Sequence, residues 1–173
     1  RVYAWNGSSW VQRGVDLNGE AASDNFGVAL SMSQDGTKLA VGARYNDTGG
    51  SNAGHVRVFN WNGSSWVQMG ADIDGFQVDM AFGSAVSISN TGTRVAIGTP
   101  LYNGTIGDQG IARVYNYNGS SWSQIGQDII GWSGTSGTNL GKSISISGDG
   151  NAIVVGSSGY SGGGSTFRGL AEY

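Results

Sequence analysis

The 173-residue chain has no cysteine, one proline and one histidine, and each scarcity excludes a class of protein. Without cysteine, a disulfide framework, a thiolate zinc site and a cysteine nucleophile are excluded. One proline excludes collagen and proline-rich linkers. Only 12% of the residues are charged, and the nine Lys and Arg residues form no cluster, so we expect no nucleic-acid binding. No apolar run approaches about 18 residues, so we expect no membrane insertion.

Glycine and aromatic residues are abundant instead. The sequence holds 32 glycines and six tryptophans, and 38% of its residues are hydrophobic. Glycine costs about 1 kcal/mol at each helix-interior position, which disfavours a helical domain. The hydrophobic and aromatic content is too high for a disordered chain. The composition therefore predicts β-structure with frequent tight turns.

A repeat dominates the sequence. The pentapeptide Asn-Gly-Ser-Ser-Trp begins at Asn6, Asn62 and Asn118, with a spacing of 56 residues both times. An aspartate and a Phe-Gly pair keep the same spacing: Asp16, Asp72 and Asp128, then Phe26-Gly27 and Phe82-Gly83. The third copy drifts and has Leu140-Gly141 in place of Phe-Gly. A fixed period of this length predicts a propeller, a solenoid or an array.

Each repeat reads as four short strands joined by turns. In the second copy we expect strands at His55–Trp61, Trp66–Ile73, Phe82–Ser89 and Thr93–Thr99. Asn62-Gly63 is a strong hairpin signal. In 82–89 one face is bulky and the other small and uncharged, which predicts that a second sheet packs closely on it. A parallel β-helix is the main alternative, but its coils are shorter and paired hairpin turns do not suit it.

The sequence therefore predicts an all-β fold of β-propeller-type repeats of about 56 residues, with four antiparallel strands per blade and three repeats present. The Phe-Gly pairs open one strand, and Ala40-Val41-Gly42-Ala43 and Ala96-Ile97-Gly98-Thr99-Pro100 close the next. With these motifs the chain resembles the FG-GAP repeats of the integrin α-subunit propeller, and in particular a subtype found in bacterial, algal and viral surface proteins. The resemblance implies a propeller fold and a surface location.

The register of this family implies a blade division within a single propeller segment, 1–173. Residues 1–17 would form an outer half-blade, 26–73 and 82–129 two whole blades, and 140–173 an inner half-blade with a terminal strand. Propellers have about four to eight blades, so three repeats are too few for a ring. We therefore expect further blades from a longer chain or from identical chains.

Metal binding and catalysis are not expected. Many FG-GAP blades carry a calcium loop of several aspartates, but the corresponding turns here hold at most one carboxylate, such as Asp35 or Asp149. The repeated aspartates are predicted to bond backbone donors at strand ends. His55 has no partner motif and is expected to be structural, and no converging pair of carboxylates can be nominated. We expect no metal, no cofactor and no enzymatic activity.

Binding is expected in the long loops 44–54, 101–110 and 158–169, because loops on a rigid scaffold usually carry recognition. The alternative is that they are solvated connectors. A non-repeated tryptophan in the irregular linker is the other contact candidate. The candidate binding residues are Trp132, Tyr45, Asn46, Asp47, Tyr102, Asn103 and Tyr160.

The repeated tryptophans flank the hairpin turns, which favours cross-strand packing, with glycan stacking as the alternative. These structural positions are Trp5, Trp10, Trp61, Trp66 and Trp122. The sequence also has five N-glycosylation sequons, three of which are the Asn-Gly turns themselves. The sequons begin at Asn6, Asn46, Asn62, Asn103 and Asn118.

Together these patterns predict a non-catalytic recognition or adhesion module, located extracellularly, on a cell surface or on a virion surface. Its partners would be a protein or a glycan on a surface. One alternative is a structural repeat module of a filament, virion fibre or capsid decoration. The other is a glycan-binding propeller lectin.

Overall fold

The computed structural model describes residues 1–105, 107–132, 137–159 and 170–172, and every regular element in them is a β-strand. All strand ladders in these ranges are antiparallel. The predicted all-β class is confirmed, and the parallel β-helix alternative is wrong for the described residues.

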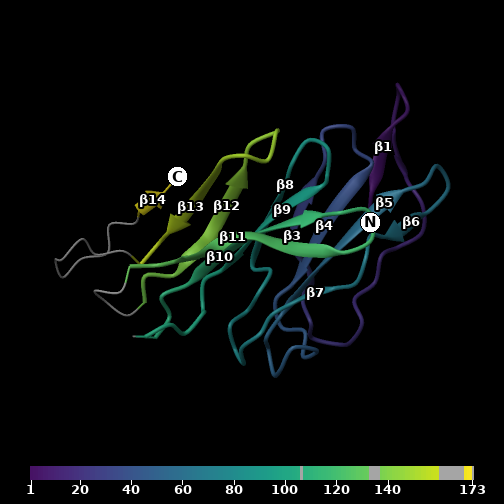
Figure 1. Cartoon of the computed structure of the whole chain (residues 1–173). Coiled ribbons are helices and arrows are strands. Elements are labelled where there is room, and N and C mark those ends of the chain that lie inside the picture. The colour runs from purple at the N-terminus through teal and green to yellow at the C-terminus, as the bar shows by residue number, and fades with distance from the viewer. Residues whose placement is uncertain (106, 133–136, 160–169, 173) are drawn as a thin grey trace.

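The strands form one hairpin and three larger sheets (Figure 1). The hairpin pairs β1 (Tyr3–Trp5) with β2 (Trp10–Gln12). The first sheet has the order β3 (Phe26–Met32), β4 (Lys38–Ala43), β5 (His55–Trp61), β6 (Trp66–Gln68), with β7 (Ile73–Asp74) also on β5. The second has the order β8 (Ala85–Ile88), β9 (Arg94–Thr99), β10 (Ile111–Tyr117), β11 (Trp122–Ile130). The third has the order β12 (Leu140–Ile146), β13 (Ile153–Ser157), β14 (Leu170–Glu172).

The three sheets stack on one another in chain order, and small residues allow the close approach. A Cβ on Gly42 would overlap the backbone carbonyl of Gly83, just before β8 of the next sheet, and a Cβ on Gly98 would overlap that of Gly141 in β12. The Ile88 amide donates to Ser31 Oγ at 3.0 Å across the first interface. The predicted packing of a second sheet on the small face is therefore observed.

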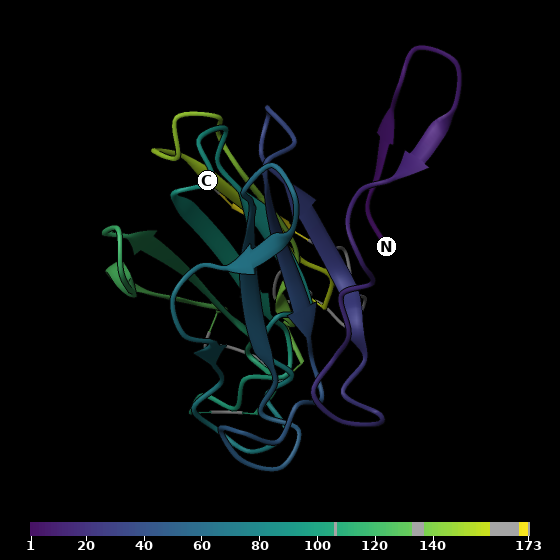
Figure 2. The same cartoon turned by 90° about the vertical axis from the view of Figure 1, so that its right-hand side faces the viewer.

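The core lies between these sheets. Bulky side chains such as Val56, Val58, Phe82 and Ile97 are fully or almost fully buried in one cluster that joins the first and second sheets. Burying such side chains is the main favourable contribution to folding. The sheets thus follow the blade arrangement of a propeller, although in the described residues they do not close into a ring (Figures 1 and 2).

Each Asn-Gly-Ser-Ser-Trp segment forms a hairpin turn with the same geometry. In the second copy, Asn62 Oδ1 accepts hydrogen bonds from the amides of Ser64 and Ser65, both at 2.9 Å. Gly63 has a φ of 102°, a conformation that glycine adopts without steric cost. The flanking aromatic residues are directly cross-strand, as predicted, with ring centroids 5.7, 5.5 and 5.1 Å apart in Trp5–Trp10, Trp61–Trp66 and Tyr117–Trp122.

Two expected strands differ from the observed ones. The strand expected at 82–89 is only β8, because the amide of Phe82 bonds the carbonyl of Ala53 and its backbone pairs with Gly54 in the preceding sheet. The strand expected at 66–73 is divided into β6 and β7. Gly70, with a φ of 72°, leaves the extended conformation between them.

Candidate functional site

The first candidate site surrounds the single histidine. His55 is the first residue of β5, and its side chain is fully buried. Neither ring nitrogen has a hydrogen-bond partner within the described part of the chain. A buried polar group without a partner is costly, so each such group requires an explanation.

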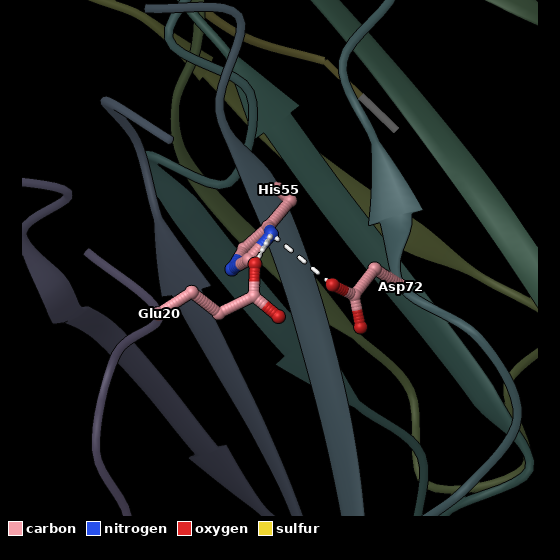
Figure 3. Close-up of side chains that lie close together, drawn as sticks. All are labelled: Glu20, His55 and Asp72. Atoms are coloured by element: carbon pink, nitrogen blue, oxygen red, sulfur yellow. Dashed lines mark ion pairs between the residues drawn. The ribbon is translucent and has the colours of Figure 1, made fainter. Parts of the chain in front are cut away.

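Three carboxylates converge on the Nδ1 atom of His55. The nearest oxygens of Asp72, Glu20 and Asp74 lie 3.4, 3.9 and 4.0 Å from this atom. Figure 3 shows Nδ1 facing both Glu20 and Asp72. We call these four residues the His55 cluster. The sequence alone nominated no pair of converging carboxylates, and the fold brings three together here.

Separate elements supply the cluster. Asp74 lies on β7, directly opposite His55 in the ladder. Asp72 lies just before β7, and Glu20 comes from the segment between β2 and β3. The segment that carries Glu20 is far from His55 in the sequence, so only the fold brings Glu20 to the histidine.

The electrostatics of the cluster are dominated by its acids. Burial, followed by the charge of Asp72, raises the pKa of Asp74, with a further contribution from Glu20, while His55 opposes this shift. One guanidinium lies nearby: Arg57 is 3.8 Å from Asp72 and 4.0 Å from Glu20. Its Nε, however, donates to Gln68 at 2.9 Å rather than to a carboxylate.

The repeated aspartates do not bond backbone donors within the described residues, which corrects the prediction for Asp16, Asp72 and Asp128. Each accepts instead from the glutamine four residues earlier, at 2.5 to 2.8 Å. Asp16 and Asp128 also accept from the arginine fifteen residues earlier. Asp72 lacks that hydrogen bond, so its Oδ2 atom faces His55.

The next repeat shows that the fold does not require this polar cluster. The residues 56 positions after Glu20, His55 and Asp74 are Phe76, Ile111 and Ile130. Phe76 there packs under the guanidinium of Arg113, whose carbon lies 3.7 Å from the ring centroid. These departures from the repeat were the available sequence signal for the His55 cluster, which the search for carboxylate pairs missed.

The second candidate site is an open pocket of about 570 Å³, which we call the Trp132 pocket. Three of the residues predicted from the sequence to bind, Tyr102, Asn103 and Trp132, line it together. Trp132 is 46% exposed. The loop that carries Tyr102 and Asn103 is held in place by Gln77. The Gln77 side chain donates to the Asn103 carbonyl at 3.2 Å and accepts from the Asn103 amide at 3.0 Å.

The other predicted binding residues lie elsewhere. Tyr45 stacks beneath the guanidinium of Arg44, 4.6 Å from the ring centroid, and Asp47 caps its own loop by accepting from Asn52. Asn46 is buried, and its amide nitrogen donates to Asp24 at 2.9 Å, so it does not suit either ligand binding or glycosylation. Tyr160 lies outside the described residues.

The remaining sequons differ in accessibility. The turn asparagines, Asn6, Asn62 and Asn118, are exposed at the hairpin tips. Asn103 is also exposed, but its Oδ1 accepts from the amide of Asp108.

The turns that hold calcium in many FG-GAP blades do not fit that ion here. In the first turn, Asp35 accepts from the hydroxyl of Ser33 at 2.6 Å and from the amide of Thr37 at 2.9 Å. The single carboxylate is thus engaged in holding its own turn, whereas calcium takes six to eight oxygen ligands. We place no calcium in these turns.

The stacked antiparallel sheets, of five, four and three strands in the described residues, define an all-β repeat protein of the propeller type. A family model described as FG-GAP repeat matches residues 18–59, which include β3, β4 and most of β5. The chain therefore contains an FG-GAP repeat, as its Phe-Gly and Ala-Val-Gly-Ala motifs predict. No curated protein matches the chain. In the described ranges no helix is long and apolar enough to cross a membrane.

Proposed function

We propose that the chain is a non-catalytic recognition module of an extracellular or particle-surface protein, and that it binds through the Trp132 pocket. One observation carries this proposal. Tyr102 and Asn103 come from the loop after β9, whereas Trp132 follows β11, yet all three line one pocket. FG-GAP repeats are typical of adhesion and surface proteins, which supports the location.

The chemistry of the pocket suits a protein or glycan ligand. Trp132 and Tyr102 offer aromatic surface, and the polar residues Asn103 and Thr105 also line the pocket. Aromatic side chains supply large contact areas with little loss of conformational entropy, which is why they are frequent at binding sites. The low content of basic residues disfavours nucleic acid.

The test is binding of the tag-free chain to an array of glycans and to intact cells or particles. Trp132→Ala should abolish the binding that the wild-type chain shows. Trp10→Ala is the matched control, because Trp10 is an exposed tryptophan on the β1–β2 hairpin outside the pocket. Equal losses in the two variants, or no loss in Trp132→Ala, would contradict the proposal. A glycan hit would favour the lectin alternative.

A second candidate function, a structural repeat module, is favoured by how the hairpins dock. The indole Nε1 of Trp66 donates to the carbonyl of Arg13 at 2.9 Å, and that of Trp122 donates to the carbonyl of Met69 at 2.6 Å. Each of these two hairpins therefore packs on the preceding repeat. Trp10 is 68% exposed, whereas Trp66 is 9% exposed. Figure 2 shows the β1–β2 hairpin projecting from the rest of the molecule.

The end of the molecule opposite the β1–β2 hairpin has a surface that could accept such a hairpin. A Cβ on Gly14 or Gly70 would meet the aromatic residues of the next hairpin, whereas nothing in the described ranges lies within 4 Å of a Cβ on Gly126. On the sheet faces, Leu30 is exposed, whereas its counterpart Val86 is buried against the preceding sheet. We propose that the surface at Gly126 accepts the β1–β2 hairpin of a second copy. The two copies would then be in head-to-tail contact.

Sedimentation of the chain over a range of concentrations tests this candidate. Self-association that Trp10→Ala abolishes and Trp132→Ala leaves intact is the expected result. A chain that stays monomeric at every concentration, or association that Trp10→Ala does not affect, would refute head-to-tail assembly. The division into blades at 26–73 and 82–129 is part of the same proposal. It is supported by the first two sheets, whose strands fall almost entirely within these two ranges.

A further inference from the structure

The His55 cluster combines features that seldom occur together without a ligand. A fully buried imidazole has no hydrogen-bond partner in the described residues, and its Nδ1 atom faces three carboxylates. None of these oxygens lies closer to Nδ1 than 3.4 Å, so the histidine is not satisfied by an ordinary hydrogen bond. Arg57 lies 3.8 Å from Asp72 and 4.0 Å from Glu20, but its Nε atom donates to Gln68 and hydrogen-bonds neither carboxylate.

We propose that Nδ1 of His55 and the carboxylates of Glu20 and Asp72, with Asp74 as a fourth ligand, bind a divalent transition-metal cation, for which Zn²⁺ is the best fit. This inference is independent of the recognition function proposed above.

The spacing of the ligand atoms supports a small cation. For metal–ligand bonds of about 2.1 Å in a tetrahedral arrangement, neighbouring ligand atoms are about 3.4 Å apart. The nitrogen–oxygen distances in the cluster are 3.4, 3.9 and 4.0 Å. The ligand atoms of Glu20, His55 and Asp72 all lie within 4.8 Å of one another. Gathering these atoms around one ion would require their separations to close by up to about 1.4 Å through movement of the carboxylate side chains.

The ligand types indicate the class of metal. An imidazole nitrogen with two or three carboxylates suits zinc and similar first-row ions. Calcium and magnesium prefer oxygen ligands only, and calcium requires six to eight of them. The cluster lies away from the turns in which FG-GAP repeats bind calcium, so this would be a different kind of site.

The position of Glu20 indicates what the metal would do. Glu20 belongs to the segment that connects the β1–β2 hairpin to β3, and its side chain is 41% exposed. His55 and Asp74 are part of the first sheet. A bound ion would therefore fasten this connecting segment to the sheet and would restrain the point at which the chain leaves the hairpin. Because Glu20 and Asp74 are partly exposed, the ion could enter from solvent.

The next repeat provides a control for the fold. Ile111 occupies the place of His55 and is fully buried. His55→Ile therefore introduces the residue that the same backbone position already accommodates 56 residues later, and this variant should fold. Asp128→Asn is the matched control for Asp72→Asn, because Asp128 is the corresponding aspartate and has no histidine beside it.

The experiment uses the tag-free, metal-depleted chain titrated with ZnCl₂ and, separately, with CaCl₂ and MgCl₂ in a calorimeter. We expect one zinc ion per chain and no comparable binding of calcium or magnesium. His55→Ile should abolish binding, and Glu20→Gln and Asp72→Asn should each weaken it at least about tenfold, because loss of even a residue that supports a metal ligand typically costs about 10–100-fold in affinity. Asp128→Asn should bind as the wild type does.

A second readout identifies the ligand directly. His55 is the only histidine in the chain, so its ring signals in an NMR spectrum are unambiguous. Zinc should shift the Nδ1 resonance strongly and raise the thermal midpoint of the wild type but not of His55→Ile. Absence of zinc binding to the wild-type chain, equal binding to His55→Ile, or an unshifted Nδ1 resonance would each overturn the proposal.

Discussion

Replacing Trp66 by alanine tests whether each hairpin is stabilised by the repeat before it. Trp66 is buried, packs against Trp61 and donates to the carbonyl of Arg13, whereas Trp10 has the same place in its own hairpin but is exposed. Truncating a buried tryptophan typically costs about 3–5 kcal/mol, and the lost hydrogen bond is part of that loss. Trp10→Ala removes only a cross-strand contact and should cost less than about 1 kcal/mol.

The assay is urea unfolding of both variants and the wild type, followed by circular dichroism. The midpoint should fall much further for Trp66→Ala than for Trp10→Ala, with similar slopes. Trp66→Phe keeps most of the packing but removes the indole donor, and it should lose about 1–2 kcal/mol. Equal costs for Trp66→Ala and Trp10→Ala would refute the view that docking on the preceding repeat buries the hairpin.

Two further perturbations test the turns and the sheet packing. Hydrogen bonds from Ser33 and Thr37 lower the pKa of Asp35 to about 2, so the stability it contributes is present above its unfolded pKa of about 3.9 and is lost as the pH falls toward about 2. Urea midpoints should therefore decline over that range, and less steeply in Asp35→Asn. Gly98→Ala places a methyl group against the carbonyl of Gly141 and should lower the free energy of unfolding by about 1–3 kcal/mol, whereas Ser145→Ala, at an exposed position of β12, should change it little.

The sequence predicts those parts of the fold that depend on local patterns. The Asn-Gly turns and their flanking aromatic residues define the hairpins, because a positive φ at glycine and a cross-strand pair are both local requirements. The length of the strand after Phe82 could not be predicted in the same way. The amide of Phe82 bonds the carbonyl of Ala53, just before β5 of the preceding sheet, and that competition exists only after the sheets have packed.

The two candidate sites also differ in how far local sequence patterns predict them. Aromatic residues in loops were sufficient to nominate Tyr102 and Trp132, although the sequence does not show that they share a pocket. The His55 cluster was missed because Glu20 lies 35 residues before the histidine, in a segment without regular structure. The sequence signal for the cluster was that this repeat has acids and a histidine at positions where the next repeat has apolar residues.

The recognition surface can be located most directly by titrating the isotope-labelled chain with the strongest ligand from the glycan and cell-binding screen and recording amide NMR spectra. The account predicts that the largest shifts occur at Tyr102, Asn103 and Trp132. Shifts concentrated instead on the β1–β2 hairpin, around His55, or at no contiguous surface would contradict the assignment of the Trp132 pocket as the binding site.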